Sequence, residues 1–301
     1  MGGGRLTASD WDNYSTTRIT GRSVHEVYSS SRMAAEFDPK GITTRESCDS
    51  ADNPNSTAII IGLDVTGSMG PVLGTIAQKL GVMVNEIYER RPVSDPHLMF
   101  LGIGDVEAGD QCPLQATQFE ADIRIAEQLT KIYFENGGGG NRYESYALAW
   151  FFAAKHTKLD CFNKRGKKGF IFTIGDEEPT PYLNAEDLKR IFSYKPEKDY
   201  SQSELLTMAR EHYEVFHLII EEGNHCRNYR DATIGAWTKL LGQHARPVSD
   251  HSKIAEVIVS ILQKEAGETD GSILKSWDSE TGSVVAKALD YVSDKADVTI
   301  S

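Results

Sequence analysis

The sequence predicts an α/β fold, in which a doubly wound, mostly parallel central sheet is flanked by helices. Two observations carry this prediction. Short, strongly apolar runs recur along the chain, and stretches of ten or more residues with apolar side chains at helical spacing separate them. Strands that alternate with helices in this way form a parallel sheet, because each crossover between parallel strands needs a long connection.

The apolar runs define the expected strands. Residues 57–65, which read TAIIIGLDV, are almost continuously apolar. A run of this kind is typical of a central parallel strand that is covered on both faces. Further strands are expected at residues 97–103, 169–174, 215–220 and 246–248, and a short edge strand or hairpin is expected at residues 112–119.

Helical spacing is clearest over residues 71–90, where Leu73, Ile76, Leu80 and Val84 fall on one face. Pro71 suits the first turn of this helix, because proline lacks an N–H group that the first turn would leave unpaired. Further helices are expected over residues 121–134, 143–156, 184–192, 203–212, 229–241 and 252–265.

Composition divides the chain into three parts. Residues 1–56 are polar and are expected to form an arm with a short helix near residues 23–37. Residues 57–266 carry the alternating strands and helices and are expected to form one domain. Residues 267–301 are polar again and are expected to form a tail with one short helix at residues 284–292.

Charge and composition exclude several classes of protein. The chain has 44 acidic and 32 basic residues, a net charge of −12, which argues against nucleic acid as a partner. No stretch approaches the ~20 apolar residues of a membrane span, and no signal peptide is visible, so a cytoplasmic location is expected. The four cysteines are far apart, and His225-Cys226 lacks a second pair at zinc-binding spacing.

Oxygen-bearing side chains follow the expected strands. Asp64, Thr66 and Ser68 follow the first strand, Asp105 follows the second, and Asp176 follows the strand at 169–174. The carboxyl ends of parallel strands form one edge of the sheet, where ligands bind. A carboxylate with two hydroxyls is a hard oxygen set, which suits Mg²⁺ and less specifically Ca²⁺ or Mn²⁺.

The segment DVTGSMG after a buried strand resembles the first motif of the metal-ion-dependent adhesion site of von Willebrand factor A (vWA) domains. The family pattern is D-x-S-x-S, then a threonine in a glycine-rich loop, then an aspartate after the fourth strand. Thr66 keeps the hydroxyl of the usual serine, and Asp176 falls where the last aspartate belongs. The resemblance covers residues 57–266 and implies a Rossmann-like vWA fold.

The glycine-rich loop departs from the family pattern. It reads GGGGNRYES and contains no threonine. Asn141 is the expected substitute ligand, with Glu144 or Ser145 as alternatives. Asp105 is expected either to reach the metal ion through water or to serve only in a turn.

The resemblance implies a binding module and not an enzyme. The metal ion would capture a carboxylate from a protein partner, such as an AAA+ ATPase or another assembly factor. Gly67, Met69 and Gly140 are expected to contact that partner.

Other interpretations of the same residues stay open. Ser68 could merely cap the following helix, and Asp176 could be a solvated loop carboxylate. A haloacid-dehalogenase-like Mg²⁺-dependent phosphotransfer enzyme also places an aspartate after its first strand, but it needs D-x-D, and Thr66 cannot act as an acid or base. The glycine run lacks the lysine of a phosphate-binding loop. A structural vWA protein without metal is the third alternative.

Overall fold

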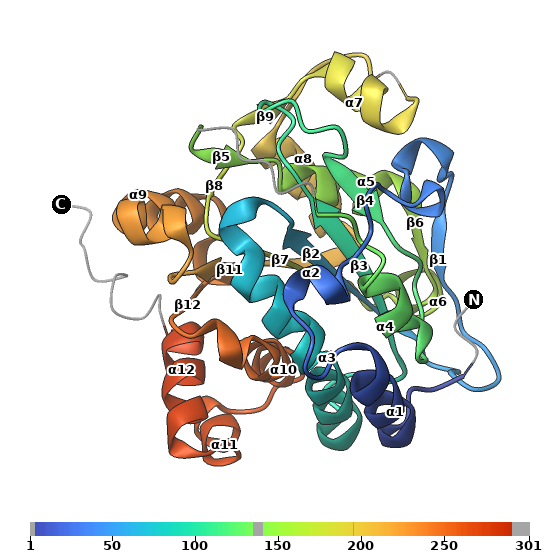
Figure 1. Ribbon diagram of the computed structural model, residues 1–301, viewed down its shortest axis with the longest axis vertical. Helices are drawn as coiled ribbons and strands as arrows, with labels where there is room; N and C mark the ends of the chain where they lie inside the picture. Colours follow the sequence, from blue (N-terminus) through green and yellow to red (C-terminus); the bar gives the residue numbers. More distant parts are fainter. Residues whose placement is uncertain (1–3, 135–140, 195, 291–301) are drawn as a thin grey trace.

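The computed structural model describes residues 4–134, 141–194 and 196–290. It confirms the predicted α/β class, with a six-stranded, mostly parallel central sheet between layers of helices (Figure 1). Across the sheet the strands are β12 (Ala245–Val248), β11 (Tyr213–Ile220), β7 (Gly169–Gly175), β2 (Thr57–Asp64), β3 (Pro96–Ile103) and β4 (Leu114–Ala116). Only β4 runs antiparallel to its neighbour.

Strand β2 lies in the middle of the sheet because its side chains are apolar on both faces. Ile59, Ile61 and Leu63 pack into one core layer, and Ala58 and Ile60 pack into the other. From β2 the chain first forms β3 on one side and later β7 on the other. The carboxyl end of β2 therefore adjoins the point where the order of strands reverses, which is where ligands bind in open α/β sheets.

Each face of the sheet is covered by its own set of helices. The first layer contains α1 (Ala8–Arg18), α2 (Val24–Val27), α3 (Gly70–Arg90), α4 (Arg124–Leu129), α10 (Ile254–Glu265), α11 (Asp270–Lys275) and α12 (Ser279–Asp290). The second contains α5 (Ala147–His156), α6 (Asp160–Arg165), α7 (Ala185–Phe192), α8 (Gln202–Arg210) and α9 (Asn224–Leu241). None of the described helices is long and apolar enough to cross a membrane.

Three pairs of very short strands lie outside the central sheet. They are β1 (Arg45–Ser47) with β6 (Thr157–Leu159), β5 (Tyr143–Glu144) with β8 (Glu178–Pro179), and β9 (Tyr182–Leu183) with β10 (Tyr200–Ser201). The helix predicted over 143–156 therefore begins only at Ala147, because Tyr143 and Glu144 pair with β8. The helix predicted over 229–241 begins earlier, at Asn224, and has a non-helical backbone at Tyr229.

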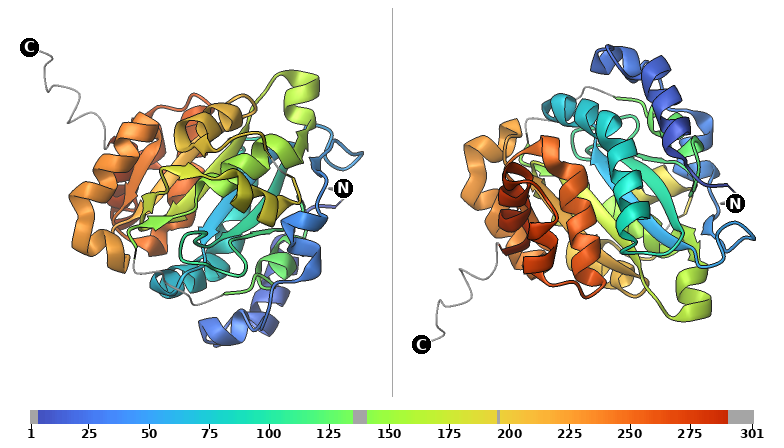
Figure 2. Two further views of the ribbon diagram at one scale, coloured as in Figure 1. Left: turned by 90° about the horizontal axis from the view of Figure 1, so that it is seen from above. Right: turned by 90° about the horizontal axis from the view of Figure 1, so that it is seen from below.

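The segments that flank residues 57–266 pack against the helical layers. Trp11 of α1 and Tyr28 just after α2 are buried in the same core layer as α3. Val285 of α12 is buried in that layer as well. The N-terminal and C-terminal segments lie on opposite sides of the molecule (Figure 2).

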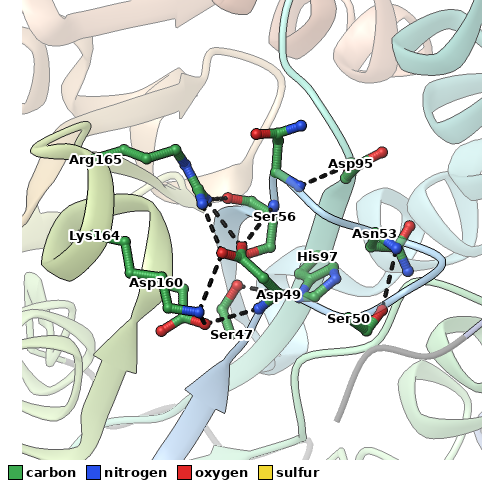
Figure 3. A network of polar contacts seen from close by, with 11 residues as sticks. Ser47, Asp49, Ser50, Asn53, Ser56, Asp95, His97, Asp160, Lys164 and Arg165 are labelled. Atoms are coloured by element: carbon green, nitrogen blue, oxygen red, sulfur yellow. Dashed lines mark hydrogen bonds and ion pairs between the residues drawn. The ribbon is translucent and has the colours of Figure 1, made fainter.

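A network of charged groups ties the segment after β1 to α6 (Figure 3). The Asp49 carboxylate accepts hydrogen bonds from Arg165 at 2.7 and 3.1 Å and from the Ser56 hydroxyl at 2.7 Å. Arg165 also donates to the backbone carbonyl of Ser56 at 2.7 Å. The Arg165 guanidinium is the main reason why the pKa of Asp49 lies well below its usual range.

Replacing Arg165 with alanine is expected to lower the free energy of unfolding by about 1–2 kcal/mol, because hydrogen bonds between charged groups contribute roughly this much when partly exposed. Chemical denaturation near neutral pH measures the change. The loss should shrink as the pH falls, because a carboxylate with a lowered pKa stabilises the fold only while it is ionised. As a control, Lys158→Ala removes the exposed pair with Glu46 and should change stability little.

Candidate metal site

Asp64, the last residue of β2, is fully buried. Its Oδ1 accepts hydrogen bonds from the backbone N–H of Thr66 at 2.9 Å and from the Thr66 hydroxyl at 2.6 Å. Its Oδ2 accepts a hydrogen bond from the Tyr146 hydroxyl at 3.0 Å. Two of the predicted ligands, Asp64 and Thr66, therefore lie together in the tight turn that leads into α3.

Asp176 directly follows β7 and is also fully buried. Its Oδ2 accepts a hydrogen bond from the backbone N–H of His225, in the first turn of α9, at 2.8 Å. A carboxylate is favourable there, because the amino end of a helix carries a partial positive charge. A Cβ atom on Gly223 would lie only 2.2 Å from the Asp176 Cβ, so this close approach requires glycine.

Asp105 lies in the loop after β3 and is 2% exposed. Its Oδ1 accepts hydrogen bonds from the Glu107 N–H at 2.8 Å and from the Ser145 hydroxyl at 3.4 Å. The Asn141 side-chain amide donates to Oδ2 of the same carboxylate. Asp105 thus closes its own turn and also holds the segment that follows the glycine run.

Glu144 and Glu177 are two further acids near Asp64. Burial, followed by the charge of Asp64, raises the pKa of Glu144 well above its ordinary value. The same two causes raise the pKa of Glu177 to about 8. Burial and the charge of Asp176 raise the pKa of Asp64 to about 7. The strongest charge effects on these three carboxyls come from other acids, so the edge of the sheet concentrates acidic groups that resist ionising together.

The donor atoms of Asp64, Thr66 and the neighbouring acids fit a hard divalent cation. They are carboxylate and hydroxyl oxygens, which Mg²⁺ prefers. Among the described residues, three acidic or histidine ligand atoms lie within 4.8 Å of one another only at Glu222, Asp250 and His251. The predicted carboxylates therefore influence one another's charge without forming a compact cage. Mg²⁺ usually keeps several water ligands, so such a cage is not needed.

The remaining predicted residues differ in how exposed they are. Gly67 is exposed, whereas Met69 is fully buried in the core and offers no surface to a partner in this arrangement. Gly140 and the side chain of Ser68 lie outside the described residues.

Sequence reasoning missed two residues of the site. Glu177 was not among the predicted ligands, but it is half buried beside Asp64 and Asp176. Tyr146 was expected only as part of a helix. The signal in the sequence was Gly175, the glycine that ends β7. The structure explains this glycine, because a Cβ there would lie 1.9 Å from the Tyr146 hydroxyl oxygen.

His225 and Cys226 belong to no group of three or more metal-binding side chains among the described residues. Cys226 is fully buried, and burial raises the pKa of its thiol to about 12. All four cysteines are free thiols.

Comparisons with known proteins find no sequence match and only a distant structural similarity. No protein-family model and no curated protein matches the chain. The structure is similar to the pilus adhesin SpaC from Lactobacillus rhamnosus GG in its open conformation, with a TM-score of 0.43 and 10% identity over 77% of this chain and 31% of the adhesin. A second structure of that adhesin gives a TM-score of 0.46 and 11% identity over 78% and 32%. The chain thus spans about a third of the adhesin's length, and similarity at this level transfers no function.

Proposed function

We propose that this protein is a vWA-type binding module that holds one divalent cation, most suitably Mg²⁺, and uses it to capture a carboxylate of a protein partner. The observation that supports this best is the group of buried acids at the carboxyl edge of the sheet. Burying several carboxyls together is unfavourable unless a cation or protons neutralise them. A divalent cation would neutralise two charges at once.

The proposed ligand set follows the residues that surround Asp64. Asp64, Thr66, Ser68 and Asp176 would hold the ion, with Glu144 in the place of the missing threonine. We prefer Glu144 to Asn141, because the Asn141 NH₂ group donates to Asp105 in the loop after β3, whereas Glu144 is buried within reach of the charge of Asp64. The bound ion would supply an electron-poor centre that accepts one more anionic oxygen.

The partner would be a cytoplasmic protein that presents an exposed Asp or Glu. An AAA+ ATPase or another assembly factor is the class that the sequence resemblance suggests. We do not assign an enzymatic activity, because Thr66 stands where a phosphotransfer enzyme of the dehalogenase type would need an acid. Turnover of a generic aryl phosphate that Asp64→Asn abolishes would contradict this proposal.

Adding Mg²⁺ to the EDTA-treated protein is expected to raise its melting temperature. At a free concentration of a hundred times the dissociation constant, linkage gives about 2.7 kcal/mol of stabilisation. Differential scanning calorimetry with and without EDTA measures the effect.

Asp64→Ala should remove this response to Mg²⁺. Asp160→Asn is the control, because Asp160 is another acid of low exposure, 7%, and its partner is Lys164 in the same helix, α6. It should leave the Mg²⁺ response intact. Melting that is indifferent to millimolar Mg²⁺ in the wild-type protein would refute the metal site.

A further inference from the structure

We propose that Tyr146 is a positioning residue, whose hydroxyl orients the Asp64 carboxylate for the cation. This inference rests on the proposed function, since it concerns the same site. It adds a residue that neither the sequence motif nor the set of proposed ligands contains.

The direction of the hydrogen bond is fixed by the neighbours of the hydroxyl. The backbone N–H of Glu177 points at the Tyr146 oxygen at 3.4 Å and can only donate. The Tyr146 O–H is therefore free to donate to Asp64 Oδ2, at 3.0 Å. A phenol that donates to one oxygen of a carboxylate restricts how the carboxylate can turn, so it fixes the direction in which the other lone pairs point.

The position of the hydroxyl is fixed by packing. Tyr146 is fully buried, and its ring meets His217 edge-on at 4.8 Å and Trp237 edge-on at 5.3 Å between ring centroids. The hydroxyl lies directly against Gly175, where a Cβ would approach it to 1.9 Å. The end of β7 therefore has no side chain at the place that the hydroxyl occupies.

Counting acceptor sites shows what this leaves for the ion. An ionised carboxylate offers about four lone-pair sites, two on each oxygen. Thr66 fills two on Oδ1, and Tyr146 fills one on Oδ2. Among the hydrogen bonds of the described residues, these leave one site on Oδ2, so the hydroxyl of Tyr146 limits the directions from which a metal ion or its water can approach.

The test is to measure the dissociation constant for Mg²⁺ by isothermal titration calorimetry in Tyr146→Phe. This substitution keeps the ring and removes only the hydroxyl. The matched control is Tyr213→Phe, because Tyr213 is also fully buried and its hydroxyl bonds Thr157 at 2.6 Å, at the opposite end of the strands. Near-ultraviolet circular dichroism and the melting temperature in EDTA establish that each variant is folded.

We expect Tyr146→Phe to weaken Mg²⁺ binding by about tenfold to a hundredfold, as is typical when a group that orients a metal ligand is removed. Tyr213→Phe should lower the melting temperature in EDTA and leave the dissociation constant unchanged. A change in the dissociation constant for Tyr146→Phe but not for Tyr213→Phe therefore distinguishes a positioning role from a loss of stability. Gly175→Ala provides a second variant, because it keeps the phenol but denies its hydroxyl the place beside Asp64, and it should weaken binding as well.

Two results would overturn the inference while leaving the proposed function in place. One is an unchanged dissociation constant in a folded Tyr146→Phe or Gly175→Ala protein. The other is an equal loss of affinity in Tyr213→Phe. Absence of Mg²⁺ binding by the wild-type protein would instead refute the proposed function, and the role of Tyr146 with it.

Discussion

Asp64→Asn is expected to stabilise the metal-free protein at pH 8 and to remove its response to Mg²⁺. Burial and the charge of Asp176 raise the pKa of Asp64 from 3.8 to about 7. Between these two values the folded protein binds more protons than the unfolded chain, so the free energy of unfolding falls as the pH rises. Over this whole range the loss is about 4 kcal/mol, of which about 3 kcal/mol falls between pH 5 and pH 8.

The amide avoids this loss because it carries no charge at any pH. Its oxygen can still accept the hydrogen bonds from Thr66, and its NH₂ group can donate to the Tyr146 hydroxyl. Urea denaturation in EDTA at pH 5 and pH 8 measures the difference between wild type and variant. Asp160→Asn serves again as the control, and here its effect should have the opposite sign, because Asp160 has a lowered pKa. Equal stability of the metal-free wild type at both pH values would contradict the prediction.

Trp237→Ala is expected to lower the free energy of unfolding by about 3–5 kcal/mol, as for other large aromatic side chains in cores. Trp237 is fully buried in α9 and stacks on His217 with 3.5 Å between ring centroids. Its Nε1 donates to the backbone carbonyl of Glu177 at 2.9 Å. The substitution would therefore open a cavity and also leave a partly buried carbonyl without that donor.

The denaturant midpoints of three variants distinguish the contribution of core packing from that of the hydrogen bond to Glu177. Trp237→Phe keeps an aromatic ring against His217 and loses the hydrogen bond, so its effect should be smaller than that of alanine. Tyr182→Ala removes an aromatic side chain that is 51% exposed and should change stability by no more than about 0.5 kcal/mol. A loss below about 1 kcal/mol for Trp237→Ala would mean that the layer around α9 repacks easily.

The main elements of the fold could be predicted because their signals are local. The run at residues 57–65 is apolar on both faces, and the structure buries seven of the eight residues of β2. The placement of Asp64, Asp105 and Asp176 followed from one rule, since the carboxyl ends of parallel strands share an edge. The structure places Asp64 at the end of β2, and Asp105 and Asp176 in the loops after β3 and β7.

What could not be predicted depends on contacts between distant residues. The two-residue strand at Tyr143 and Glu144 exists only through its pairing with Glu178 and Pro179. The bond from Tyr146 to Asp64 joins residues 82 positions apart. Helix α1 lacks an apolar face, but Thr7 and Asp10 form a capping box, and that local signal could have predicted where it begins.

The candidate site is assembled from widely separated pieces of the chain, with consequences for how it forms during synthesis. Asp64 leaves the ribosome early, but the backbone N–H that holds Asp176 belongs to His225, more than half of the chain later. A nascent chain that ends before α9 therefore carries the first motif without the support of its last carboxylate. If the site binds a cation as proposed, high affinity for it should appear only after α9 has been synthesised and docked.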